Sequence, residues 1–92
     1  MFKRVLIQFP IVTLLVCLSA VSVVAEPSID QLIQQAETAI QAGDAKMQER
    51  LWREILRRDP KNERAYGELA IALQEQERYE DAIAVYREAI KR

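Results

Sequence analysis

The sequence repeats its pattern of small and apolar residues after 34 positions, starting from the stretch 29–60. The matched pairs are Leu32 and Tyr66, Ala36 and Ala70, Ala39 and Leu73, Ala45 and Tyr79, Trp52 and Tyr86, Ile55 and Ala89, and Leu56 and Ile90. A period of this length is typical of a paired-helix unit that buries its apolar face only by stacking on a copy of itself. Such stacks usually serve as binding scaffolds, so the repeat predicts a broad function but no particular partner.

The first 25 residues differ in composition from the rest of the chain. Lys3 and Arg4 precede an uncharged, largely apolar run, residues 5–25, which ends in small residues before a polar stretch. A basic start, an apolar middle and a small-residue end are the parts of a secretory signal. We therefore predict a signal peptide over residues 1–25, cleaved after Ala25, and export to a periplasmic, lumenal or extracellular space.

Two alternatives remain for this segment. About 20 apolar residues can span a bilayer, so residues 5–25 could stay as a single-pass anchor with the repeats on the non-cytoplasmic side. Lipidation at Cys17 is the weaker alternative, because bulky Val16 precedes it where a small residue is wanted.

Cleavage would also remove Cys17, the only cysteine, and the sequence has no histidine. The remainder then has neither a disulfide nor a cysteine-ligated metal. Without Lys3 and Arg4, the 13 basic residues fall to 11 against 14 acidic ones, which gives a net charge of −3. A mildly acidic chain argues against nucleic acid as a partner, so we predict none.

Capping residues and helical spacing divide the rest into four helices. Ser28 and Gln31 fit a capping box, and the first helix runs to Gly43, which suits the left-handed turn that ends a helix. Asp44 caps the second helix, and Asp59-Pro60 stops it because proline cannot continue a helix.

Asn62 is the expected cap of a third helix, which ends near Gln76. A fourth helix carries one continuous apolar stripe, made of Tyr79, Ala82, Ile83, Tyr86, Ala89 and Ile90. No segment shows the alternation typical of a strand. We therefore predict an all-α chain, with a short lead-in at 26–28 and helix-turn-helix units at 29–62 and 63–92.

Residues 63–92 resemble a tetratricopeptide repeat, and residues 29–62 resemble a more degenerate one. The second unit has the family's large and small residues at Tyr66, Leu69, Ala70, Tyr79, Ala82, Tyr86 and Ala89. The first unit has Leu32, Ala36, Gly43, Ala45, Trp52 and Asp59-Pro60. The resemblance implies an α-solenoid of two repeats in a right-handed stack, preceded here by a hydrophobic signal helix. In this family the concave face binds an extended peptide or a partner helix.

Small residues at helix crossings let the backbones approach, and aromatic residues fill the space beside them. The residues predicted to pack between helices are Leu32, Ala36, Trp52, Tyr66, Leu69, Ala70, Tyr79, Ala82, Tyr86 and Ala89. Trp52 is therefore expected in the core rather than as a surface anchor. Gln48 stands at the position of Ala82, so it either finds a polar partner or loosens the crossing. Glu77 stands at the position of Gly43, so we expect the second turn to reverse in another way.

Nothing in the sequence supports catalysis. Without His or Cys after residue 25, the nucleophilic triads and the usual zinc sites are excluded, and the two glycines form no phosphate loop. We predict no enzyme, no catalytic residue, no cofactor and no metal. One basic cluster is expected to pair with acids such as Glu49 and Glu54 rather than to hold an anionic partner. Its members are Arg50, Arg53, Arg57, Arg58, Lys61 and Arg64.

The resemblance implies that the first helix of each unit lines a peptide groove. The residues opposite the packing stripe are predicted to form it, and they are Asp30, Ile33, Gln34, Glu37, Gln41, Arg64, Glu68, Ile71, Gln74 and Glu75. Their acidic and amide side chains favour a neutral or basic extended segment as the ligand.

These patterns together predict an exported, non-catalytic protein-binding scaffold. One alternative is a membrane-anchored structural subunit that keeps residues 5–25 and self-associates through its repeats, at the open edge after Ile90. Another is the N-terminal segment of a longer protein whose activity lies beyond Arg92, since the second unit shows no Asp-Pro stop and no closing helix.

Overall fold

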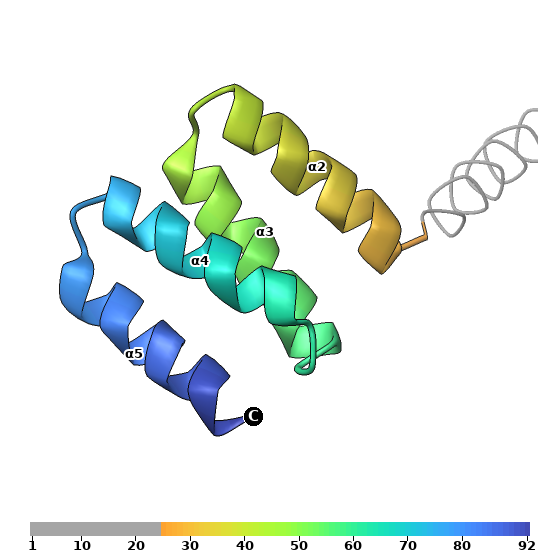
Figure 1. Cartoon of the computed structure of the whole chain (residues 1–92). Coiled ribbons are helices and arrows are strands. Elements are labelled where there is room, and N and C mark those ends of the chain that lie inside the picture. The colour runs from red at the N-terminus through yellow and green to blue at the C-terminus, as the bar shows by residue number, and fades with distance from the viewer. Residues whose placement is uncertain (1–24) are drawn as a thin grey trace, which may run out of the picture.

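The computed structural model describes residues 25–92, which form four α-helices and, within that range, no strand. The helices are α2 (Ile29–Gln41), α3 (Ala45–Arg58), α4 (Glu63–Glu75) and α5 (Tyr79–Lys91). Each helix contacts the next one along the chain, so the four lie side by side in sequence order (Figure 1). For these described residues, the predictions of an all-α fold and of four helices are confirmed. The predicted signal helix or anchor lies outside the described residues, apart from Ala25.

Three helices begin at the capping residues that the sequence predicts. The backbone N–H of Gln31 donates to Ser28 Oγ at 3.2 Å, and the Ser28 N–H donates to Gln31 Oε1 at 2.8 Å, which completes a capping box. Asp44 and Asn62 each accept a hydrogen bond from the N–H three residues further on, at 3.1 and 3.0 Å. These bonds satisfy donors that have no partner inside the helix, and they explain where α2, α3 and α4 start.

The turn inside each repeat contains one residue in the left-handed region. Gly43 has a φ of 69°, and Glu77, 34 positions later in the sequence, has a φ of 60°. In both turns the next N–H donates to the carbonyl five residues back, at 3.0 and 2.9 Å. The expectation that Glu77 reverses the chain differently is wrong. Both turns close with the same helix-ending hydrogen bonds, and these require a left-handed residue at this point whatever its side chain.

A single hydrophobic core extends across the three helix–helix contacts, α2–α3, α3–α4 and α4–α5. Trp52 and Ile55 of α3 are fully buried, so Trp52 is a core residue and not a surface anchor. Alanines let the neighbouring helices approach this centre. The buried cluster consists of Leu32, Ala36, Ala39, Leu51, Trp52, Ile55, Ala65, Leu69, Ala70, Leu73 and Ala82.

Gln48 lies in this core and is only 2% exposed. Its Nε2 donates to the carbonyl of Ala39 on α2 at 3.3 Å. Of the two outcomes expected for this departure from the repeat pattern, the polar partner is the one observed. The hydrogen bond offsets the cost of burying an amide.

Within residues 25–92, α5 is covered on one side only, by α4 (Figure 1). Ala82 is buried in that contact, but Tyr79 and Tyr86 are 58% and 40% exposed. The prediction that both tyrosines pack between helices is therefore wrong for this part of the chain. The counterparts of these tyrosines in the 34-residue pattern are Ala45 and Trp52. Both belong to α3, which has a neighbouring helix on two sides, whereas α5 has one on a single side.

Candidate functional site

The ten residues predicted to form a peptide groove lie on α2 and α4, and we call them the α2–α4 surface. All of them are exposed except Ile33 and Glu68, which are half-buried. The structure brings three together, because Arg64 Nη1 lies 3.1 Å from Glu37 Oε1 and Arg64 Nε lies 3.6 Å from Glu68 Oε1. The first of these ion pairs joins α2 to α4.

Arg64 also covers the core. Its guanidinium carbon lies 5.4 Å from the ring centroid of Trp52, within the range of a cation–π contact. Arg64 thus closes the outer side of Trp52 while it neutralises Glu37 and Glu68. The predicted attraction for basic ligands is weaker than the sequence suggests, since two of its carboxylates already share a cation. Sequence reasoning missed this arrangement because 27 residues separate Glu37 from Arg64.

Half of the basic cluster, namely Arg53, Arg57 and Arg64, forms ion pairs within the described residues. Arg53 Nε lies 3.0 Å from Glu49 Oε2, and Arg57 Nη2 lies 2.7 Å from Glu54 Oε1. The hydrogen bond from Arg57 holds the pKa of Glu54 below its ordinary value. The expected pairing with Glu49 and Glu54 is confirmed for Arg53 and Arg57. Within the described residues, Arg50, Arg58 and Lys61 form no ion pair, so their positive charge stays available.

Glu49 connects α3 to the end of α4 and to the turn before α5. Its Oε1 accepts hydrogen bonds from Arg78 Nη1 at 2.7 Å and from Gln76 Nε2 at 3.0 Å, and its Oε2 accepts one from Arg53 Nε at 3.0 Å. Burial alone would raise the pKa of Glu49. The hydrogen bonds from Gln76 and Arg53, together with the charge of Arg78, outweigh that effect and hold the pKa below its ordinary value.

The second candidate surface is the uncovered side of α5. Four large apolar side chains line it, and we call them the α5 stripe: Tyr79, Ile83, Tyr86 and Ile90. Ile83 is 49% exposed and Ile90 is 84% exposed. A row of this kind on one helix is typical of a surface that another polypeptide covers.

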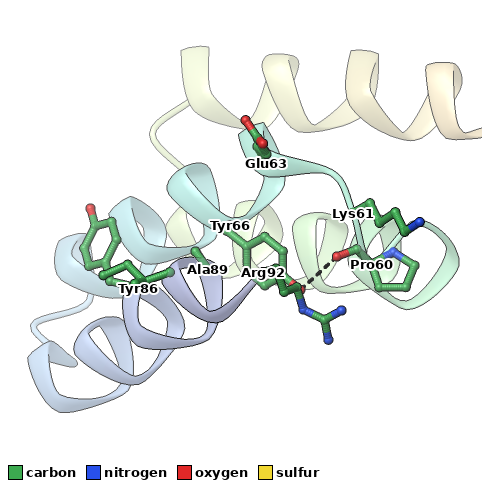
Figure 2. Close-up of a pocket in the computed structure, with 8 residues that line it drawn as sticks. Pro60, Lys61, Glu63, Tyr66, Tyr86, Ala89 and Arg92 are labelled. Atoms are coloured by element: carbon green, nitrogen blue, oxygen red, sulfur yellow. Dashed lines mark hydrogen bonds between the residues drawn. The ribbon is translucent and has the colours of Figure 1, made fainter.

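A hollow lies beside this stripe, between the start of α4 and the end of α5. Its lining residues are Pro60, Lys61, Glu63, Tyr66, Tyr86, Ala89, Ile90 and Arg92. Figure 2 shows the Tyr66 side chain directed at the Pro60 carbonyl, to which its hydroxyl donates at 2.9 Å. The guanidinium carbon of Arg92 lies 5.9 Å from the centroid of the same ring. The walls are thus mainly aromatic and aliphatic, with cations from Lys61 and Arg92 at the rim.

Residues 25–92 hold no cluster of three His, Cys, Asp or Glu side chains placed to bind a metal ion. None of the helices from α2 to α5 is both long enough and apolar enough to cross a membrane.

A scan against protein-family models matches residues 12–92 to a family described as BTAD, bacterial transcriptional activator domain. This family is helical and related to the tetratricopeptide repeats, but no tetratricopeptide model matches the chain. A search of curated proteins gives no match, and a search of solved structures gives none either. The resemblance inferred from the sequence therefore holds for helical repeats in general. A family of transcriptional activators also agrees with the prediction that the chain is no enzyme.

The family match corrects two predictions. The exclusion of nucleic acid rested on a net charge of −3, and it is wrong because transcriptional activators work on DNA. The predicted location, whether exported or anchored with the repeats on the non-cytoplasmic side, is wrong because transcription takes place where the DNA is. The match also begins at residue 12, inside the assigned leader.

Proposed function

Because the chain belongs to the bacterial transcriptional activator domain family, we propose that it is a non-catalytic protein-interaction domain of a transcriptional activator. Its architecture in this proposal is two tetratricopeptide-like units, residues 29–62 and 63–92, in a right-handed stack. The matching left-handed turns at Gly43 and Glu77 support two equivalent units.

The observation that carries this proposal is the exposure of the α5 stripe. Its four side chains, two tyrosines and two isoleucines, are each exposed by 40% or more. Water contact with so much apolar surface is unfavourable, at roughly 25 cal/mol per Å². A bound polypeptide that covers the stripe removes this cost, and the tyrosine hydroxyls can stay at the wet rim of such an interface.

The α2–α4 surface is the second place where a partner is proposed to bind. Ile71, which is 44% exposed, offers an apolar contact on the surface that also presents the exposed amides of Gln34 and Gln74. Amides both donate and accept hydrogen bonds, so they suit an extended segment whose backbone groups need partners.

Site-specific photo-crosslinking in a bacterial cell tests the proposal. A photoreactive amino acid replaces Ile83 in the α5 stripe, Ile71 in the α2–α4 surface or, as the control, exposed Lys46 at the start of α3. We expect protein adducts of defined mass from Ile83 or Ile71 and none from Lys46. Adducts to protein from none of the three positions would contradict the proposal.

A DNA titration of the full chain tests the competing assignment. If this domain itself contacts DNA, its affinity should fall with salt, and Arg50→Glu combined with Arg57→Glu should weaken binding and reduce the salt dependence. DNA binding of that kind, without any protein adduct, would assign the domain to nucleic-acid contact instead.

A further inference from the structure

We propose that the α5 stripe is closed by α5 of a second copy of this chain, with the two helices packed antiparallel. This inference rests on the proposed function, because it names the partner of one interaction surface. It is carried by the order of the apolar residues along α5, by the hollow beside it and by the charges that flank it.

The apolar residues complement one another when α5 is reversed. Tyr79, Ile83, Tyr86 and Ile90 are spaced by four, three and four residues, so they form a single face with an internal symmetry. An antiparallel pair sets Tyr79 of one copy opposite Ile90 of the other, and Ile83 opposite Tyr86. Each aromatic ring then meets an aliphatic side chain, and large residues pack against smaller ones along the whole contact.

In this arrangement the hollow can receive Tyr79 of the second copy. Ile90 and Tyr86 form part of its lining, beside Tyr66 and Ala89 (Figure 2). Tyr79 of the second copy, opposite Ile90, comes to the mouth of this hollow. Tyr79 is 58% exposed within one chain, and the apolar walls would cover it in the pair.

The charges beside the stripe favour the same orientation. Glu80, Arg87 and Lys91 are seven and four residues apart, so they share one flank of α5. Within residues 25–92, none of the three forms an ion pair. Reversal of the second helix places Glu80 of each copy between Arg87 and Lys91 of the other, twice by symmetry.

The contact is small, which predicts its strength. A helix of 13 residues is about 20 Å long, and one helix pair of this length lies below the usual size of a permanent interface. We therefore expect a reversible dimer whose population depends on protein concentration.

Charge reversal with rescue tests the pairing. One variant of the full chain carries Glu80→Lys, and a second carries Arg87→Glu with Lys91→Glu. Each alone sets like charges against each other across the pair, whereas a mixture of the two variants restores both contacts. A third variant, Lys46→Glu, reverses a charge at the exposed start of α3, outside both candidate surfaces.

Sedimentation equilibrium gives the mass of each sample, and circular dichroism checks that its helices are intact. We expect the native chain and Lys46→Glu to approach the dimer mass as concentration rises. Each α5 variant should associate roughly tenfold more weakly, and their mixture should recover the native behaviour.

A native chain that stays monomeric at every concentration would overturn the inference. So would dimers that survive both α5 variants, since such association would come from elsewhere, for example from residues 5–25. In either case, adducts from Ile71 or Ile83 to other proteins would leave the proposed function standing. Rescue by the mixture, without an adduct to any other protein, would support the inference and restrict the domain to self-recognition.

Discussion

Glu49 of α3 accepts a hydrogen bond from the guanidinium of Arg78, with 2.7 Å between Oε1 and Nη1, across 29 residues of sequence. The same carboxylate holds Gln76, the residue that ends α4. The turn of the second repeat is therefore tied directly to the second helix of the first. This contact adds an electrostatic link to the apolar packing between the units, and it should respond to pH.

The change Glu49→Gln should lower the free energy of unfolding by about 1 kcal/mol at neutral pH. Burial, which alone raises the pKa of Glu49, is outweighed by the bonds from Gln76 and Arg53 and by the charge of Arg78, so the folded-state pKa is depressed. Its stabilisation is fully present above the unfolded-state value, about 4.3, and is lost as the pH falls through the folded-state pKa.

Urea unfolding of both proteins, from neutral pH down to about pH 3, measures this difference. We expect the difference to shrink as the pH falls through the folded-state pKa, because protonated Glu49 resembles glutamine. Glu54→Gln is the control, because its ion pair with Arg57 is more exposed than that of Glu49 and should contribute less. Parallel pH profiles for the native chain and Glu49→Gln would show that the Glu49 pKa is not depressed.

The change Glu77→Gly should stabilise the chain by about 0.5–1 kcal/mol. The left-handed conformation costs a residue with a side chain roughly 1–2 kcal/mol. Glycine removes this cost, but its more flexible unfolded state offsets part of the gain. Thermal unfolding checks the gain. The matched control is Gly43→Ala, which should destabilise by a similar amount because φ there is 69°, although nothing lies within 4 Å of an added Cβ. Equal melting temperatures for all three proteins would contradict the strain assigned to Glu77.

The change Ala82→Leu should destabilise the chain by about 1–3 kcal/mol, because a larger side chain overfills the crossing of α4 and α5. Ala82 is 2% exposed, whereas Ala84 on the same helix is exposed. Ala84→Leu is therefore the control and should stay within about 0.5 kcal/mol of the native chain. Denaturant unfolding compares them, and a native-like midpoint for Ala82→Leu would remove this residue from the crossing.

The change Gln48→Met should alter the free energy of unfolding by less than about 1.5 kcal/mol, because it nearly keeps the volume and removes a buried polar group. The Ala39 carbonyl stays satisfied in that variant, since it also accepts the N–H of Asp44 at 3.0 Å. Gln48→Ala should cost about 2 kcal/mol or more through the cavity it leaves. If the two variants unfold alike, the hydrogen bond of Gln48, and not its packing, is what stabilises this crossing.

Much of the helical framework could be predicted from the sequence because its causes are local. Ser28, Asp44 and Asn62 satisfy backbone donors three residues away, and Asp59-Pro60 ends α3 through the shape of the proline ring. The apolar spacing on each helix likewise depends only on the period of that helix. These features need no knowledge of what lies beside the helix.

The α2–α4 surface could be predicted only as a set of exposed positions. Arg64 covers Trp52 and joins Glu37 to Glu68. These contacts depend on how α4 packs against α3 and α2. These ion pairs set how much charge the surface offers to a ligand. A count of acidic and basic residues does not reveal which of them are paired.

By itself, the sequence determined the four helices of residues 25–92, because capping, turn chemistry and periodicity act within a few residues. Only the tertiary structure decided which helix faces are covered. Trp52 is buried and its counterpart Tyr86 is 40% exposed, although both occupy the same place in the repeat. The difference arises because burial is a property of neighbouring helices, and within the described residues α3 has two such neighbours while α5 has one.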